Sequence, residues 1–454
     1  MSIKMLHGVR LPHHKEGTVG CVPKRMPVPA AVTIPMSMHI GAPAKPVVKA
    51  GDTVKVGQLI AEAGGFVSAP IYSSVSGTVK KVEQVSPFNG TSSMGVIIET
   101  DGLQEPYEGL TPPEVTDLQS FVDAVRASGA VGLGGAGFPT AVKLNVKPEQ
   151  VDYICVNGAE CEPYITTDTR TMLDDGELLT DGIRTMLKFY QPKQVYVVIE
   201  DNKPQCIKHM KELTAGIDNV TIVAAPSLYP QGGEKVLIYN TTGRVVPAGK
   251  LPIDVGCVVI NTTTTVAIAR YLKTGMPLVE KYVTVDGSAI ANPQNVIVPI
   301  GAKAQDVIDF CGGFKVDPGK VIFGGPMMGM SMPDTDSIVV KSTNAILCFD
   351  KKDAVLPEPT ACIKCGRCIS HCPLKLMPAD IETAYELNKP EDLKALQVNL
   401  CMECGCCSFI CPARRPLVQV NKLAKQMLNE YNNKLKAEEE KRKAKEAEKE
   451  ANKA

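Results

Sequence analysis

Two matching runs of cysteine constrain this chain more than any other feature. The runs hold eight of its 16 cysteines and read Cys362-x-x-Cys365-x-x-Cys368-x-x-x-Cys372-Pro373 and Cys401-x-x-Cys404-x-x-Cys407-x-x-x-Cys411-Pro412. The first residues, MSIKMLHGVRLPHHKEG, contain no apolar stretch, so we expect no secretory signal. Clustered cysteines in a long chain of this kind indicate metal binding rather than disulfides.

The spacing within the runs predicts two [4Fe–4S] clusters. Two residues between successive thiolates let a looping backbone place three sulfurs around one cubane, and the fourth cysteine of each run then ligates the other cluster, as in two-cluster ferredoxins. Zinc ribbons lack the third evenly spaced cysteine and the trailing Cys-Pro. Cys406 is out of register and is predicted to be a non-ligand. The predicted ligand sets are Cys362, Cys365, Cys368 and Cys411, and Cys401, Cys404, Cys407 and Cys372.

Helical patterns surround the cysteine runs. MPADIETAYELN and PEDLKALQVN lie between the runs, so residues 357–420 are predicted to form an α-helical two-cluster module that resembles α-helical ferredoxins. Residues 421–454 are almost entirely helix formers and charge. Pairs such as Glu438 with Arg442 and Glu439 with Lys443 predict an exposed charged helix there.

The overall composition excludes some functions. The 454 residues indicate three or four domains, and 49 basic residues balance 49 acidic ones. A general attraction to nucleic acid or anionic lipid is therefore not expected. No apolar run approaches the length of a membrane-spanning helix, so we expect any membrane association to come through partner subunits.

The N-terminal third is predicted to be β-rich. Residues 1–32 are rich in Pro and His and are expected to form an irregular extension. Residues 33–100 contain short strand signals broken by turns, and they resemble the biotinyl/lipoyl-type hammerhead module. The turn SAPIYSSVSG lacks that family's attachment lysine, so a structural module is expected rather than a swinging-arm carrier. Residues 101–113 are predicted to be a linker.

The middle of the chain alternates between strand and helix signals. Between residues 114 and 250, apolar runs at 151–157, 194–200 and 220–226 are separated by helical patterns, which predicts a parallel sheet. Within residues 251–356, the segment 281–314 resembles a soluble-ligand-binding β-grasp domain, for which we expect packing rather than ligand binding. The stretch FGGPMMGMSMP is either a mobile contact loop or, as we favour, an adaptable filler of the core.

A glycine-dense segment, GLGGAGFPTAVKL, opens the α/β region. Gly132-x-Gly134-x-x-Gly137 is formally a dinucleotide fingerprint, but a helical pattern precedes it where the fingerprint requires a strand. The segment is instead predicted to be a turn that opens a helix near Pro139. Its backbone N–H groups could hold a phosphate, with Lys143 adding charge, or it could be a tight packing turn.

Polar side chains follow two of the predicted strands. Asn157, Glu160 and Glu162 come at the end of VDYICVN, where α/β sheets bind ligands. They could hydrogen-bond a ring and a ribose, or they could cap the next helix. Gln231-Gly232-Gly233-Glu234 again combines glycines with a carboxylate at a strand-to-helix turn.

These segments together resemble a known family. GLGGAGFPTAVKL followed by VNGAECEP resembles the flavin- and NADH-binding subunit of respiratory complex I. YPQGGEKVLIYNTTGRVVPAGKLPIDVGCVVIN, the order of the parts and the C-terminal two-cluster module resemble the C subunit of Rnf complexes, which are membrane-bound, ion-translocating ferredoxin:NAD oxidoreductases. The resemblance covers nearly the whole chain except its charged tail. The complex I protein departs from this pattern because it ends in a single-cluster motif.

The resemblance implies a multidomain α/β and β protein. Its parts would be a hammerhead-like β-module, a Rossmann-like α/β flavin domain, a β-grasp domain, an α-helical two-cluster ferredoxin module and a charged C-terminal helix. It also implies non-covalent FMN, with NAD(H) as substrate. By motif matching, Gly134, Gly135, Gly137 and Lys143 would hold the FMN phosphate, Asn157, Glu160, Glu234 and Asn261 would lie near the ring or ribityl chain, and Glu162 would lie near the nicotinamide nucleotide. The match is weaker at Asn261.

The implied function is electron transfer within a larger complex. A nicotinamide exchanges two electrons, a cubane exchanges one and a flavin can do both, so the flavin must stand between them. We expect a peripheral subunit on the cytoplasmic face of a bacterial membrane, bound through other Rnf-type subunits and served by ferredoxin directly or through another subunit, with no nucleic acid. Electrons would run from the clusters to NAD⁺, although the chemistry also allows the reverse. Two alternatives stay open: a non-enzymatic iron–sulfur relay or scaffold, and the flavin subunit of a soluble bifurcating oxidoreductase.

Overall fold

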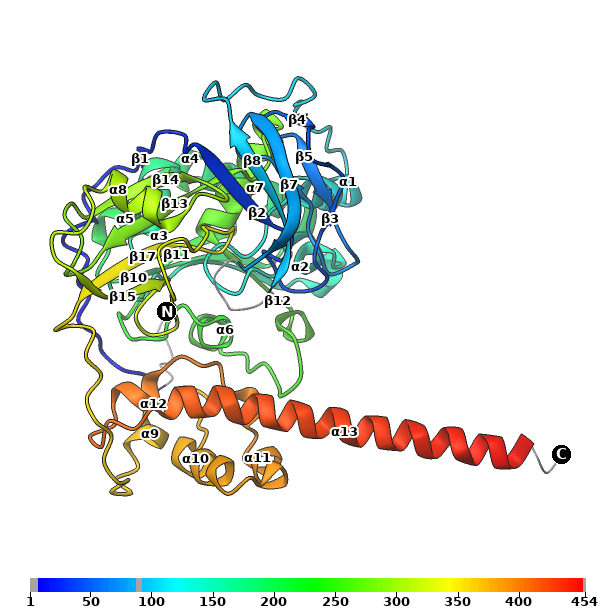
Figure 1. The fold of residues 1–454 in the computed structure, drawn as a ribbon, viewed down its shortest axis with the longest axis vertical. Coiled ribbons are helices and arrows are strands. Elements are labelled where there is room, and N and C mark those ends of the chain that lie inside the picture. Colours follow the sequence, from blue (N-terminus) through cyan, green and yellow to red (C-terminus); the bar gives the residue numbers. More distant parts are fainter. Residues whose placement is uncertain (1–6, 87–91, 452–454) are drawn as a thin grey trace. The chain divides into compact units, whose positions relative to one another are not determined.

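The computed structural model describes residues 7–86 and 92–451 (Figure 1). The chain divides into two compact units. The larger consists chiefly of Leu11–Val355 and contains all of the β-sheets, and the smaller consists chiefly of Leu356–Ala454 and is helical. Within the described residues, no helix is both long enough and apolar enough to cross a membrane.

The first part of the larger unit is a β-module of two antiparallel sheets (Figure 1). Alternating side chains, such as Val32 and Ile34 on one strand and Val79 on another, bury one face of each strand in a shared core. Residues 68–77, which include SAPIYSSVSG, are buried except for half-buried Tyr72, as a structural role requires. One sheet has the order β2-β8-β7-β4, made of Ala31–Pro35, Ser93–Thr100, Gly77–Val85 and Thr53–Val54, and the other has β3-β5-β6, made of Lys45–Pro46, Leu59–Glu62 and Ile71–Tyr72.

A four-stranded parallel sheet forms the centre of the larger unit. Its order is β11-β10-β9-β12, and helices separate successive strands, as the alternating pattern predicts. The strands are β9 Tyr153–Gly158, β10 Gln194–Glu200, β11 Val220–Ala225 and β12 Cys257–Asn261. The helices are α1 Leu118–Ala127, α2 Thr140–Leu144, α3 Thr167–Asp174, α4 Gly176–Tyr190, α5 Pro204–Leu213, α6 Glu234–Thr242 and α7 Thr262–Thr274. Strand β12 lies beyond residue 250, where we expected the α/β region to end, because its buried residues pair with β9.

The helical segment between β9 and β10 forms two helices, α3 and α4, which meet at Asp175. The carboxylate of Asp175 accepts hydrogen bonds from Arg270 (2.9 Å) and from the hydroxyl of Tyr282 (2.8 Å). Gly176, which follows, allows close packing, since a Cβ there would lie 2.6 Å from Leu213. These contacts come from residues far along the chain, so helical periodicity alone does not reveal the break.

A six-stranded sheet completes the larger unit, in the order β1-β14-β13-β17-β15-β16. Its first strand comes from the N-terminal extension, which is therefore not a separate irregular segment: β1 pairs in parallel with β14. In FGGPMMGMSMP, Met328 and Met330 are exposed, whereas Met332 is half-buried and packs against the hydrophobic core, so only part of this stretch fills the core. The elements are β1 Lys24–Arg25, β13 Glu280–Asp286, β14 Gln294–Pro299, α8 Ala304–Phe310, β15 Pro318–Phe323, β16 Met330–Ser331 and β17 Ala345–Asp350.

The smaller unit packs short helices against a long one, α13 (Leu417–Ala451). Ala424 and Leu428 of α13 are buried against the other helices, so its first turns belong to the core of the unit and not to a solvated tail beginning at residue 421. Farther along, Glu439 pairs with Lys443 as predicted, whereas Arg442 pairs with Glu446 instead of Glu438. The short helices are α9 Arg367–Ser370, α10 Pro378–Glu386, α11 Pro390–Ala395 and α12 Cys406–Phe409.

Candidate functional site

The strand order of the parallel sheet contains the reversal at which α/β sheets bind ligands. From β9 the chain runs outward to β10 and β11, then returns to β12 on the other side of β9. In α/β sheets, ligands bind in a crevice at the carboxyl ends of the two strands on either side of such a reversal, which here are β9 and β12. Asn157, next to the last residue of β9, and Asn261, the last residue of β12, are paired in register at this point. The structure therefore brings together two predicted site residues that lie about a hundred positions apart.

Both asparagines are held by hydrogen bonds that fix the backbone around the crevice. The side chain of Asn261 accepts from the amide of Thr264 (3.2 Å), which caps α7, and donates to Asp168 (2.8 Å). The amide of Asn157 donates to the carbonyl of Gly232 (2.9 Å). Gly232 has to be glycine here, since a Cβ would lie 2.3 Å from a carbonyl oxygen of the loop after β9.

The glycine-dense loop lies beside this crevice and offers free amides. Gly137 has the left-handed φ of +67°, which closes the loop. A Cβ on Gly134 would lie 2.6 Å from the side chain of Asn261, whereas a Cβ on Gly135 would meet nothing within 4 Å. Within the described part of the chain, the amides of Gly134, Gly135 and Ala136 have no hydrogen-bond partner, and all three residues are exposed. Consecutive unpartnered amides form a concavity that suits an anion such as a phosphate.

Lys143 and Glu234 form an ion pair. The ammonium of Lys143, on α2, lies 2.7 Å from the carboxylate of Glu234, the first residue of α6, and 3.0 Å from the carbonyl of Val259. Both side chains are about one-third exposed. Lys143 is thus not an isolated cation beside the glycine loop, because its charge is already balanced by a second predicted site residue.

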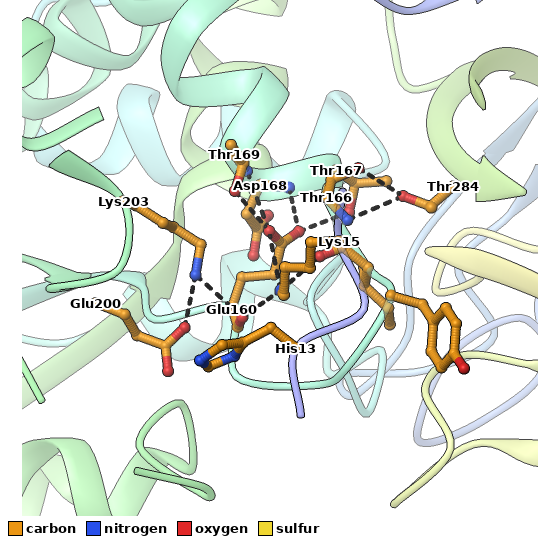
Figure 2. A network of polar contacts seen from close by, with 12 residues as sticks. His13, Lys15, Glu160, Thr166, Thr167, Asp168, Thr169, Glu200, Lys203 and Thr284 are labelled. Atoms are coloured by element: carbon orange, nitrogen blue, oxygen red, sulfur yellow. Dashed lines mark hydrogen bonds and ion pairs between the residues drawn. The ribbon is translucent and has the colours of Figure 1, made fainter. Parts of the chain in front are cut away.

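Glu160 occupies a buried polar network (Figure 2). Its carboxylate accepts hydrogen bonds from the amide of Asp168 (2.7 Å) and the hydroxyl of Thr169 (2.7 Å), so it caps the first turn of α3. This is the capping alternative that the sequence left open, and it differs from the resemblance-based expectation that Glu160 lies near the flavin ring. Burial raises the pKa of Glu160, and the charge of Lys15 opposes that rise.

Two lysines that the sequence did not single out complete the network. Lys15 donates to the carbonyls of Glu160 (2.7 Å) and Ile165 (2.6 Å), and its ammonium lies 3.7 Å from the Glu160 carboxylate. Lys203 donates to the same Glu160 carbonyl (3.2 Å) and to Glu200 (2.6 Å). Lys15 lies in an otherwise exposed segment, and no periodic pattern marks it. Lys203 follows β10 directly, and its position at a strand end was the available signal.

Glu162 links the loop after β9 to the six-stranded sheet. Its carboxylate accepts hydrogen bonds from the amides of Met327 (3.0 Å) and Met328 (2.8 Å). A Cβ on Gly325 would lie 2.1 Å from this carboxylate, so the loop before β16 can approach only as glycine. Burial raises the pKa of Glu162 to about 7, although the two amide hydrogen bonds act to lower it. FGGPMMGMSMP is therefore a contact loop anchored on a predicted site residue.

The raised pKa of Glu162 predicts a pH-dependent stability. Between its ordinary pKa of 4.5 and about 7, the folded protein binds a proton that the unfolded chain does not, so the stability contributed by Glu162 falls as pH rises through that window. A glutamine side chain does not titrate, so the Glu162→Gln variant does not lose stability in this pH window. We expect the variant to gain stability relative to wild type between pH 5 and pH 8 by on the order of 2 kcal/mol. Thermal unfolding followed by circular dichroism would measure this, with exposed Glu149→Gln as control. A difference that does not change with pH would contradict the expectation.

A cavity lies elsewhere in this unit. It has a volume of about 400 Å³ and is lined by Arg25, Leu133, Asp175, Arg270 and Tyr282, among others. The acidic groups on its wall are paired with these arginines, as for Arg270 with Asp175. Apart from its contact with Leu133, this cavity does not include the glycine loop or the other predicted site residues.

In the smaller unit, the two cysteine runs fold alike. Each position of the first run has its counterpart 39 residues farther on, beginning with Cys362 and Cys401, and short helices α9 and α12 occupy equivalent places. Left-handed residues occur at the same three steps of both runs, which are Lys364 and Glu403, Gly366 and Gly405, and Lys375 and Arg414. Such residues turn the backbone sharply, so each run forms a loop of the kind that wraps a cluster.

The fourth cysteines lie beside the opposite runs. Cys372 of the first run lines one cavity together with Cys401, Cys404 and Cys407 of the second, and Cys406 also lines it. Burial raises the pKa of Cys368, with a smaller contribution from the neighbouring thiol of Cys411. Cys372 thus lies with the three cysteines of the second run that the spacing assigns to it, and Cys411 lies near Cys368. Among the residues described, no three histidine, cysteine or acidic side chains converge as ligands of a single metal ion.

Hydrogen-bond donors surround the second set of cysteines. The amide of Asn421, on α13, lies 3.6 Å from the sulfur of Cys401, and the backbone amide of Leu376 lies 3.4 Å from the sulfur of Cys372. Lys425, one helical turn beyond Asn421, donates to the carbonyl of Cys401 (3.1 Å). Sequence analysis missed Asn421 because it begins a segment that was assigned to the solvated tail.

Comparison with protein families divides the chain in a similar way. A family described as the RnfC barrel sandwich hybrid domain matches residues 3–103, one described as the Nuo51 FMN-binding domain matches residues 125–270, and one described as the SLBB domain matches residues 282–331. These matches confirm a multidomain α/β and β protein. The match to the FMN-binding domain spans the glycine loop, both asparagines and β12.

Several curated proteins are similar over most of their length. The chain is 43% identical over 388 residues to the C subunit of the Na⁺-translocating ferredoxin:NAD⁺ oxidoreductase complex of Acetobacterium woodii, covering 84% of this chain and 87% of that protein. It is 43% identical over 357 residues to the proton-translocating counterpart of Clostridium ljungdahlii, covering 78% of each. It is 38% identical over 435 residues to the C subunit of the ion-translocating oxidoreductase complex of Rhodobacter capsulatus, covering 94% and 84%. This chain therefore belongs to the family of C subunits of ion-translocating, ferredoxin:NAD-type oxidoreductase complexes.

Proposed function

We propose that this chain is the peripheral, cytoplasmic subunit of a membrane-bound ferredoxin:NAD oxidoreductase and passes electrons between NAD(H), FMN and two [4Fe–4S] clusters. The observation that carries the proposal is the pairing, in one chain, of a crevice with free backbone amides and a crossed set of cysteines. The first suits a flavin phosphate and the second suits two cubanes. Membership of this family of C subunits supports the same assignment and implies other subunits as partners, with ferredoxin acting directly or through one of them.

The crevice fits FMN in several respects. The amides of Gly134, Gly135 and Ala136 would receive the phosphate, and the open space above Gly135 would admit it. Asn157 and Asn261 would hold polar atoms of the ribityl chain or ring at the strand ends. Lys143 and Glu234 would offer one donor and one acceptor from their ion pair. When bound, FMN would exchange hydride with NAD(H) and single electrons with the clusters.

Glu162 has a different role from the one the resemblance implies. Its carboxylate is occupied by the amides of Met327 and Met328, so it would contact a nicotinamide nucleotide only by exchanging these donors for groups on the ligand. We propose that Glu162 shapes one wall of the nucleotide site by holding the loop of the β-grasp domain against it. In this way the β-grasp domain contributes to the site by packing.

The cysteines fit two clusters with crossed ligation. Cys372 would complete the set of Cys401, Cys404 and Cys407, and Cys411 would complete the set of Cys362, Cys365 and Cys368. The first three cysteines of each run would approach their cluster from a loop closed by left-handed residues. Cys406 lines the same cavity as the second set. It is the cysteine that would take the place of Cys407 if the ligand were exchanged.

An anaerobic titration tests the proposed function. NADH would be added to the purified chain, loaded with clusters and FMN, and followed by visible and EPR spectroscopy. We expect the flavin absorbance to bleach and reduced-cluster signals to follow. Intact clusters without flavin, and without any response to NADH, would favour a non-enzymatic relay or scaffold instead.

The contact between Asn421 and Cys401 predicts a measurable effect on the reduction potential of one cluster. A hydrogen bond to a ligand sulfur stabilises the reduced, more negative cluster and so raises its reduction potential. We therefore expect Asn421→Leu to lower the potential of the cluster bound through Cys401 and to leave the other potential unchanged. Potentiometric EPR titration would measure both. Asn429→Leu, at an exposed position on the same helix, is the matched control. Equal shifts of both clusters, or none, would contradict this role.

A further inference from the structure

The segment around Lys15 is hydrogen-bonded to the candidate site. Residues 11–20 are mostly exposed, but Lys15 and Thr18 are buried. The hydroxyl of Thr166 donates to Thr18 (2.9 Å), and the amide of Tyr164 donates to the carbonyl of His13 (2.9 Å). These contacts cover one side of the loop that follows β9 and carries the predicted site residues.

Lys15 is the charged contact among them. Figure 2 shows its ammonium beside Glu160, with Lys203 and Glu200 next to it. Two lysines and two carboxylates are therefore buried together, and their charges balance. A buried carboxylate that loses its counter-ion is strongly destabilised, because neither water nor another charge replaces the lost interaction. Lys15 also caps the carbonyls of Glu160 and Ile165, the two ends of the loop that carries Glu162.

We propose that Lys15 is a positioning residue of the flavin and nucleotide site, acting as the counter-ion of Glu160. The carboxylate of Glu160 holds the first turn of α3, and Asp168 on that turn orients the Asn261 amide at the end of β12. The chain of contacts runs from Lys15 through Glu160 and Asp168 to Asn261, which lies against the glycine loop. The inference rests on the proposed function, because it assigns Lys15 a role in that same site.

Charge rescue tests the proposal. Lys15→Met removes the counter-ion, and the double variant Lys15→Met with Glu160→Gln restores the charge balance of the network. Hydrogen–deuterium exchange of the segment 159–170 would be measured in the full-length, flavin-free chain, and FMN affinity would be measured by fluorescence titration. Lys24→Met, an exposed lysine of the same N-terminal region, is the control.

We expect Lys15→Met to accelerate exchange in this segment and to weaken FMN binding by about tenfold, because only part of the cost of breaking a buried pair reaches the flavin site. The double variant should return both measurements to within about threefold of wild type, with Ile165 still lacking its partner. If the double variant is as impaired as the single one, Lys15 acts through its hydrogen bonds to backbone carbonyls. The counter-ion role is then overturned.

The two readouts separate this proposal from the proposed function. If hydrogen–deuterium exchange changes in Lys15→Met and is restored in the double variant while FMN affinity stays unaltered, a role for Lys15 in the site is overturned. A wild-type chain that binds no FMN would overturn the proposed function, and the exchange data would still decide whether Lys15 is the counter-ion of Glu160.

Discussion

Replacing Gly135 with valine is expected to abolish FMN binding while the protein stays folded. A Cβ at this position meets nothing within 4 Å, and its backbone has no left-handed φ, so the side chain costs the protein little. The same open space is where the phosphate would approach the free amides of the glycine loop. A branched side chain there would hold the phosphate away from these donors. Losing one or two charge-assisted hydrogen bonds weakens binding by about a hundredfold or more.

Gly20→Val is the matched control for this experiment. A Cβ on Gly20 also meets nothing within 4 Å, but Gly20 lies outside the glycine loop. Flavin fluorescence titration would measure affinity, and circular dichroism with iron content would verify that the fold and clusters are intact. Valine at Gly135 that leaves FMN affinity unchanged would move the phosphate to another part of the crevice. Loss of the fold in Gly135→Val would contradict the open space seen at this position.

Short-range patterns predicted the elements of the fold well. The buried runs at 151–157, 194–200 and 220–226 correspond to β9, β10 and β11, and the helical patterns around the cysteines correspond to α10 and α11. Strand and helix periodicities are local properties, so one segment is enough to recognise them. The parallel order of the sheet followed from the alternation of these elements.

Contacts between distant segments were beyond the reach of such patterns. Lys15 and Glu160 are 145 positions apart, and no periodicity connects a lysine in an exposed segment to a strand-end carboxylate. The break at Asp175 depends on Arg270 and Tyr282, and the burial of Asn421 depends on the cysteine loops that it faces. In each case a side chain acquires its role from a partner that the fold brings to it.

The glycine loop illustrates the difference within one site. Its glycines and their backbone role were predictable, because a turn with several glycines can expose amides. The pairing of Lys143 with Glu234 was not predictable, because these residues lie on helices α2 and α6 and meet only in the folded sheet. The motif therefore located the unpartnered amides, whereas the structure pairs the charge of Lys143 with a residue of the protein itself.

Replacing Cys372 with alanine is expected to remove the cluster of the second run. Cys372 belongs to the first run by sequence, but it lines the cavity formed by Cys401, Cys404 and Cys407. With crossed ligation, Cys372→Ala and Cys401→Ala should lose the same cluster, and iron content should fall from roughly eight to roughly four atoms per chain. Cys365→Ala should lose the other cluster. EPR spectra of the reduced variants would identify which cluster remains.

Cys406→Ala is the control for the cysteine variants, because Cys406 lines the same cavity but lies out of register. We expect it to retain both clusters and the wild-type spectrum. Uncrossed ligation would give the opposite pairing of spectra, with Cys372→Ala resembling Cys365→Ala. If Cys406→Ala loses a cluster while Cys407→Ala retains both, then Cys406 is the ligand and the register assigned to the second run is wrong by one residue. The three comparisons together determine whether Cys372 crosses to the cluster of the second run.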